Sequence, residues 1–187
     1  MTLAARCGLL LTAVAVATVA RAEIPVDRAA QLLFRALAYE RRIVANPAPE
    51  ALISVVTRTG GVAPACVAIK QELQQLALQT PVGKRRAKVG YLAFIDAKTF
   101  GEALRRVKPD AVLVCGGLEP AVPSIAEATR EHKVLSFGMS RAMVDAGLSV
   151  ALDDVRGRPG LVVNLANARA EGAALDASLL QVSDVIR

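Results

Sequence analysis

The sequence contains no tryptophan, one histidine and three cysteines, and aromatic side chains make up only 3% of it. Its hydrophobic fraction is nevertheless 53%, so the core must be built mainly from leucine, valine, isoleucine and alanine. A zinc site needs three or four Cys, His or carboxylate ligands, so this small number of histidines and cysteines, without a C-x-x-C spacing, argues against zinc. We therefore expect neither a bound metal nor a cofactor.

The motifs of common catalytic sites are missing as well. No G-x-S-x-G elbow is present, and the glycine-containing loops match neither G-x-G-x-x-G nor the P-loop pattern. His132 lies between two charged residues at the end of an expected helix, where a solvated cation is the common explanation. A Cys115–His132 nucleophile pair is the remaining catalytic alternative, although an exported thiol more often pairs or is buried. These absences predict a non-enzymatic protein.

The first 22 residues have the three parts of a secretory signal peptide. Arg6 supplies a positive charge, residues 7–20 form an apolar run, and residues 20–22 read Ala-Arg-Ala, an A-x-A-like cleavage signal. The apolar run is shorter than the roughly 20 residues needed to cross a bilayer, which argues against an uncleaved anchor. We predict cleavage after Ala22 and a periplasmic mature chain, residues 23–187, of the size of one domain.

A formal net charge of +6 is the other bias in composition. Basic proteins often bind nucleic acid or anionic lipid, but the expected export excludes most nucleic acid. The only dense basic cluster consists of Lys84, Arg85 and Arg86 with Lys88, next to an expected strand. We interpret this cluster as a solvated loop and expect no nucleic-acid partner.

Helical and strand patterns alternate along the mature chain. Alternation at this spacing predicts an α/β fold with a mostly parallel sheet flanked by helices. The rhythm breaks after residue 148, where two apolar strands are separated by too few residues for a parallel crossover, which predicts a C-terminal antiparallel hairpin. A final helix follows it. The expected helices are 27–44, with Asp27 as N-cap, 64–79, 98–107, 122–132 and 176–186; the expected strands are 52–57, 88–95, 111–115, 134–137, 148–152 and 161–165.

Removal of the signal peptide takes Cys7 with it and leaves Cys66 and Cys115 in a compartment that permits disulfides. Two cysteines allow a single intrachain bridge, and whether it forms depends on geometry, because their Cα atoms must come within about 7 Å. Both cysteines are expected near the carboxyl edge of the sheet. We predict that they form the bridge.

Parallel sheets of this kind bind ligands at the carboxyl ends of their strands. Gly60 and Gly61 follow the first expected strand, Gly116 and Gly117 follow the third, and Ser136 belongs to the segment after them. These residues form a candidate ligand crevice, in which the glycine loops can present backbone N–H groups to an anion. The alternative for each loop is a plain turn, since turns are rich in glycine and serine.

Several stretches resemble the YfiR-like family of exported bacterial regulatory proteins. They are residues 35–42 in the first helix, 146–148 before the hairpin, and 163–165, Ala168-Arg169, Gly172 and Leu179-Leu180 near the end. The resemblance spans essentially the whole mature domain, and its motifs are structural rather than catalytic. The chain departs from the best understood member in lacking Trp-Pro after the first helix, and in having too few cysteines for a second disulfide.

The resemblance implies a periplasmic repressor that holds an inner-membrane diguanylate cyclase inactive and so limits cyclic-di-GMP production and biofilm formation. An inner-membrane cyclase or sensor is the implied partner, with an outer-membrane lipoprotein and a second copy of the chain as further candidates. A periplasmic solute-binding protein, associated with a transporter or sensor, is the alternative. Such receptors usually have two lobes, and this chain has room for one. An enzyme ranks third, because an acid, base and nucleophile set is missing.

Overall fold

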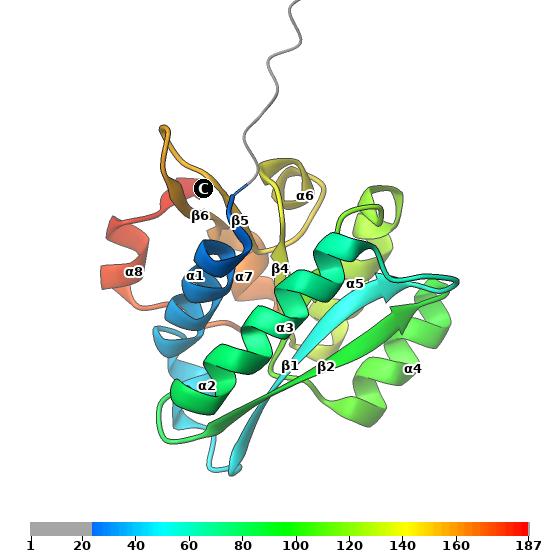
Figure 1. Ribbon diagram of the computed structural model, residues 1–187, viewed down its shortest axis with the longest axis horizontal. Helices are drawn as coiled ribbons and strands as arrows, with labels where there is room; N and C mark the ends of the chain where they lie inside the picture. The colour runs from blue at the N-terminus through cyan, green and yellow to red at the C-terminus, as the bar shows by residue number, and fades with distance from the viewer. Residues whose placement is uncertain (1–23, 187) are drawn as a thin grey trace, which may run out of the picture.

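The computed structural model describes residues 24–186, so the expected signal peptide and its cleavage after Ala22 lie outside the described residues. Seven strands form one sheet in the order β2-β1-β3-β4-β5-β6-β7, with helices on both faces (Figure 1). No helix of the described part is long and apolar enough to cross a membrane. The strands are β1 (Glu50–Arg58), β2 (Arg86–Phe94), β3 (Ala111–Val114), β4 (Leu135–Gly138), β5 (Val150–Asp154), β6 (Pro159–Asn164) and β7 (Asp184–Ile186). The helices are α1 (Val26–Ala38), α2 (Arg41–Ala45), α3 (Pro64–Gln79), α4 (Ala97–Val107), the 3-10 helix η1 (Glu119–Ala121), α5 (Val122–His132), α6 (Arg141–Asp145), α7 (Leu165–Ala170) and α8 (Ala177–Gln181).

Strands β1 to β5 run parallel, and β6 pairs antiparallel with β5. The predicted mostly parallel sheet and its C-terminal hairpin are therefore confirmed. The chain places β2 on one side of β1 and β3 on the other, so the order of the strands reverses between β1 and β3. Helices that follow β1 and β3 consequently leave in opposite directions, and the carboxyl ends of these two strands flank an opening.

Alternation of side chains in the sheet divides the core into two main layers. Ile53 and Val55 of β1 pack with α1 and α3 on one face, whereas Val56 packs with α4 and α5 on the other. Figure 1 shows α3 lying across β1 and β2 on the near face, with α4 and α5 behind them. Because both faces are covered, β3 and β4 are buried along their whole length.

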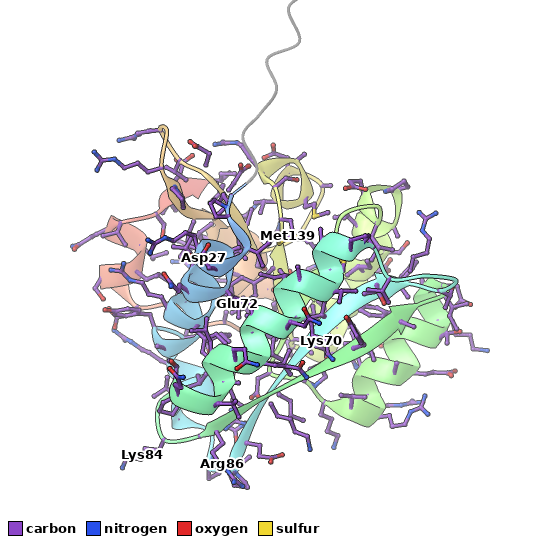
Figure 2. All side chains as sticks on the ribbon, in the orientation of Figure 1. Asp27, Lys70, Glu72, Lys84, Arg86 and Met139 are labelled. Atoms are coloured by element: carbon purple, nitrogen blue, oxygen red, sulfur yellow. A yellow bond between two sulfur atoms is a disulfide. The ribbon has the colours of Figure 1, made fainter. Side chains whose placement is uncertain are left out.

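The basic cluster at residues 84–88 is only partly the solvated loop that was predicted. Lys84, Arg86 and Lys88 are exposed, and Figure 2 shows Lys84 and Arg86 projecting from the lower edge of the molecule. Arg85 is only 4% exposed, so the prediction is wrong for this residue. The reason is a partner distant in the sequence, Asp110, which lies just before β3.

The guanidinium of Arg85 joins three segments at the amino edge of the sheet. Its Nη1 and Nη2 donate to the two carboxylate oxygens of Asp110 at 2.7 and 2.9 Å, and its Nε donates to the carbonyl of Ala48 at 3.0 Å. Further hydrogen bonds go to the carbonyls of Ile43 and Glu50. This two-point pairing with surrounding acceptors is the arrangement in which a buried arginine is stable.

The first predicted helix is broken into α1 and α2 at Glu40. The buried carboxylate of Glu40 accepts hydrogen bonds from the backbone N–H of Ile43, at the start of α2, and from that of Ala174 at 2.7 Å. Asp27 is not the N-cap that was predicted, because Pro25 occupies that position and Asp27 lies in the first turn. The apolar rhythm continues across the break, which explains why periodicity alone did not find it.

The end of the chain also differs from the expectation. The final helix is confirmed, but it spans only α8, and residues 184–186 form β7 beside β6. Val182 is 62% exposed, whereas Leu179 is buried. Helices α6 and α7 were not predicted, because each is too short to show a period.

Replacing Arg85 by alanine is expected to lower the free energy of unfolding by roughly 3–5 kcal/mol, because it leaves the nearly buried carboxylate of Asp110 unpaired. Urea-induced unfolding followed by circular dichroism measures the change. The matched control is Arg86→Ala at the neighbouring exposed arginine, for which we expect a change within about 0.5 kcal/mol. Equal effects of the two substitutions would contradict the role assigned to Arg85.

Candidate functional site

A pocket of about 430 Å³ lies at the carboxyl ends of β1 and β3, where the strand order reverses. Ligands of open α/β sheets bind at this position because the loops there diverge and leave a crevice. The end of β1, the loop before α3, the first turn of α3 and the loop after β3 all contribute to it. Its lining residues are Thr57, Arg58, Gly61, Val62, Ala63, Cys66, Cys115, Gly116 and Gly117.

The predicted disulfide forms part of this pocket. Cys66 in the first turn of α3 is bonded to Cys115, the residue directly after β3, and their Cα atoms are 5.8 Å apart. This separation lies in the ordinary range for disulfides. Both cysteines are buried near the carboxyl edge, as predicted. The bond fixes the start of α3 to the end of β3 and so holds the two sides of the pocket together.

The alternative pairing of Cys115 with His132 is not supported by the structure. The sulfur of Cys115 is in the disulfide, and His132 ends α5, at the opposite end of this helix from the loop that follows Cys115. His132 instead lies with Lys98 and Glu131 beside a separate groove between α4 and α5. Among residues 24–186, no three His, Cys, Asp or Glu side chains are grouped in a way that could hold a metal ion.

Most of the glycines of the candidate crevice come together, but the serine does not. Gly61, Gly116 and Gly117 line the pocket, and Gly60 lies in the same loop without lining it. Ser136 lies inside β4, is fully buried and bonds to Glu171. It is separated from the pocket because it lies within β4, two residues before the carboxyl end of this strand, and its hydroxyl bonds to Glu171.

Two residues outside the candidate crevice, Thr57 and Arg58, also line the pocket. Thr57 is 5% exposed and, by the alternation of β1, lies on the same face as Val55, toward α3. Arg58 is exposed, and its Nη2 donates to the carbonyl of Gly117 at 2.7 Å, so its side chain crosses from one loop of the pocket to the other. Arg58 is the one charged side chain among the described residues that line the pocket. The period-2 pattern of β1 is the signal that identifies Thr57.

A second polar cluster, centred on Glu171, is sealed inside the protein. Its carboxylate accepts hydrogen bonds from the hydroxyls of Thr129 and Ser136 at 2.7 and 2.6 Å, from the hydroxyl of Ser149, and from the backbone N–H of Ser136 at 2.9 Å. Burial raises the pKa of Glu171, while the surrounding hydrogen bonds oppose this shift. Because Glu171 has no exposed surface, the cluster joins α5, β4 and α7 and does not face a ligand.

Glu171→Gln is expected to flatten the dependence of stability on pH. Since the pKa of Glu171 is raised in the folded state, its contribution to stability is complete below the unfolded-state pKa and is lost as pH rises through the folded-state pKa. Urea titrations between acidic and neutral pH should show this decline in the wild type and not in the variant. Glu127→Gln, at an exposed position of α5, should keep the wild-type profile. Parallel profiles for the wild type and the Glu171 variant would contradict the prediction.

The disulfide predicts that denatured, unreduced mature protein has no free thiol. A Cys66→Ser/Cys115→Ser variant should lose roughly 2–4 kcal/mol of unfolding free energy, because the bridge restricts an unfolded loop spanning 49 residues. Thiol titration and urea unfolding provide the two measurements. Reduced wild-type protein is the control and should unfold like the variant. Two free thiols in the unreduced protein would refute the bond.

The fold and the pocket place the chain in the class of open, mostly parallel α/β domains with a crevice at the carboxyl edge. Within that class, a family model described as YfiR/HmsC-like matches residues 29–184. The chain therefore belongs to the YfiR/HmsC-like family, and the resemblance seen in the sequence is confirmed. No curated protein matches the chain at a significant level.

Solved structures share the fold at low sequence identity. A conserved domain protein from Vibrio cholerae O1 biovar El Tor has 16% identity and a TM-score of 0.61, over 87% of this chain and 60% of that protein. The ABC domain in complex with L-Trp from Streptococcus pneumoniae has 13% identity and a TM-score of 0.60, over 85% of this chain and 60% of that protein. CD0873, a substrate-binding protein with adhesive properties from Clostridium difficile, was solved ligand-free and open; it has 15% identity and a TM-score of 0.57, over 88% and 60%. This chain thus spans about 60% of the length of each.

Proposed function

We propose that this protein is a periplasmic, non-enzymatic regulator that represses an inner-membrane diguanylate cyclase, and so limits cyclic-di-GMP production and biofilm formation. The observation that carries the proposal is membership of the YfiR/HmsC-like family across residues 29–184. This family has a periplasmic regulatory role, which supports the coarser part of the proposal directly. The cyclase as target comes from the best understood member of the family.

The use of buried charge supports a role without catalysis. Arg85 pairs with Asp110, Glu40 caps a helix, and Glu171 accepts hydrogen bonds inside the core. A catalytic site keeps such groups at a cleft, where a substrate can reach them. In this protein they connect strands and helices, and the described lining of the pocket contributes Arg58 as its charged side chain.

The partners in this proposal follow from the expected compartment. A protein exported by a signal peptide cleaved after Ala22 meets the periplasmic part of an inner-membrane cyclase or sensor. An outer-membrane lipoprotein and a second copy of the chain are further proposed partners. Nucleic acid is not among the proposed partners, because export separates the protein from the nucleic acid of the cytoplasm.

A small-ligand binding protein is the second candidate, and one observation favours it. The pocket of about 430 Å³ lies at the switch point of the sheet, the position at which such folds bind ligands. Substrate-binding proteins also share the fold. Residues 24–186 form a single sheet with this pocket at its carboxyl edge.

Deletion of the gene is expected to raise cellular cyclic-di-GMP severalfold and to increase biofilm, because the cyclase loses its repressor. The full chain supplied from a plasmid should restore the low level, and a chain without residues 2–22, retained in the cytoplasm, should not. Mass spectrometry of nucleotide extracts measures the change. An unchanged level under several growth conditions would contradict the proposal.

The identity of the neighbouring genes distinguishes the regulator from the small-ligand binding protein. A neighbour that encodes a membrane protein with a GGDEF-type cyclase or a sensor-kinase domain favours the regulator. A permease and ATPase pair favours the ligand-binding candidate.

A further inference from the structure

We propose that the pocket at the carboxyl ends of β1 and β3 binds a small molecule through a single carboxylate group, with an apolar substituent against the disulfide. This inference rests on the ligand-binding candidate and names the chemistry of its ligand. It is independent of which membrane protein the chain represses. The observations that carry it are an unused hydroxyl, unused backbone donors and an arginine that forms no ion pair within residues 24–186, all in one pocket.

The hydroxyl belongs to Thr57. Its residue is 95% shielded from solvent, and the hydroxyl has no hydrogen-bond partner among residues 24–186. Every fully buried side-chain oxygen or nitrogen in the described part does have a partner, so the Thr57 oxygen must reach the surface of the pocket that this residue lines. A hydroxyl at the wall of a pocket, without a partner in the protein, can bond to water or to a ligand. Its position therefore suits a ligand oxygen.

Unused backbone donors belong to the loop after β3 that lines the same pocket. Gly116 and Gly117 line the pocket, and within the described chain their N–H groups donate to no acceptor. Gly117 has a φ of +84°, which turns the backbone in a way that non-glycine residues rarely adopt. Helix α3 begins at the pocket and is 16 residues long, and its first turn contains no acidic side chain that would compensate its positive end.

The charge of the pocket suits one negative group. Arg58 contributes a single positive charge, and its bond to Gly117 uses only one of its amino groups. Glu119 is the opposing charge, since an added Cβ at Gly116 would lie 3.8 Å from its Oε1. One arginine, with a carboxylate near the Gly116 side of the pocket, is too little positive charge for a phosphate dianion, and phosphate loops supply a larger set of backbone donors and a lysine. A monocarboxylate carries a single negative charge, which the one positive charge of Arg58 can balance.

The remaining walls are apolar. Val62, Ala63 and the Cys66–Cys115 disulfide line the pocket beside the polar groups. Small-molecule sites combine such walls with a few polar groups that fix orientation. A ligand whose carboxylate contacts Thr57 and the Gly116-Gly117 loop would therefore place a short apolar group against the disulfide.

The test is a titration of the mature chain from Glu23 with isobutyrate, followed by NMR of backbone amides. Isobutyrate combines one carboxylate with a branched apolar group, and roughly millimolar affinity is expected for so small a ligand. The signals of Gly116, Gly117 and Ala65 should shift on addition. Isobutyramide, which has the same shape without the charge, and inorganic phosphate are the comparison ligands and should bind at least about tenfold more weakly.

Variants assign the effect to the proposed groups. Arg58→Ala and Thr57→Val should each weaken isobutyrate binding, the former by about tenfold or more. Glu119→Gln should strengthen it, because it removes the opposing charge. Arg86→Ala removes an equal charge at the far end of the sheet and is the matched control, so its affinity should equal that of the wild type. Thermal unfolding of each variant establishes that it is folded.

Equal binding of isobutyrate and isobutyramide would overturn the inference while leaving a ligand pocket in place. Tighter binding of phosphate would replace the carboxylate with another anion and would also overturn it. Shifts away from Gly116 and Gly117, or an equal loss of affinity in the Arg86 control, would show that the pocket is not the site. None of these outcomes bears on cyclic-di-GMP levels, so failure of this inference is distinct from failure of the repressor proposal.

Discussion

The Cys66–Cys115 disulfide is the bond on which the geometry of the carboxyl edge depends. It joins α3 to the end of β3 across 49 residues and crosses the point where the strand order reverses. Without it, the two sides of the pocket would be joined, apart from the strands, by the hydrogen bond from Arg58 to Gly117. The periplasm predicted for the chain is oxidising and permits this bond. The geometry of the pocket would therefore depend on export to that compartment.

The two edges of the sheet are used differently. At the amino edge, Arg85 and Asp110 bond to each other in a buried network that joins the starts of the strands. At the carboxyl edge, Thr57, Arg58 and the Gly116-Gly117 loop retain unused hydrogen-bonding capacity around an open pocket. The structure thus places its buried charge pair and its unused hydrogen-bonding groups at opposite ends of the parallel strands.

Hydrophobic periodicity predicted the alternating helices and strands, the antiparallel hairpin and the neighbourhood of the cysteines, because it reports which side chains are buried against the sheet. It placed Arg85 in solvent because a charged residue becomes buried only through a partner, and that partner lies 25 residues away. It missed the break at Glu40 for the same reason, since the acceptor role of this residue involves Ala174. The glycines of the pocket could be found by spacing, and the period-2 pattern of β1 could place Thr57. The hydrogen bond from Arg58 to Gly117 could not be found this way, because it depends on the order of the strands.

The central claim is that this YfiR/HmsC-like protein acts by binding an inner-membrane signalling protein from the periplasmic side. The most direct measurement is cross-linking of the tagged, exported protein in intact cells, followed by purification from the membrane fraction and mass spectrometry. The account predicts that an inner-membrane protein with a cytoplasmic cyclase domain is recovered as the main cross-linked species, and that reducing its level reduces the recovery. Recovery of transporter subunits in its place would contradict the account.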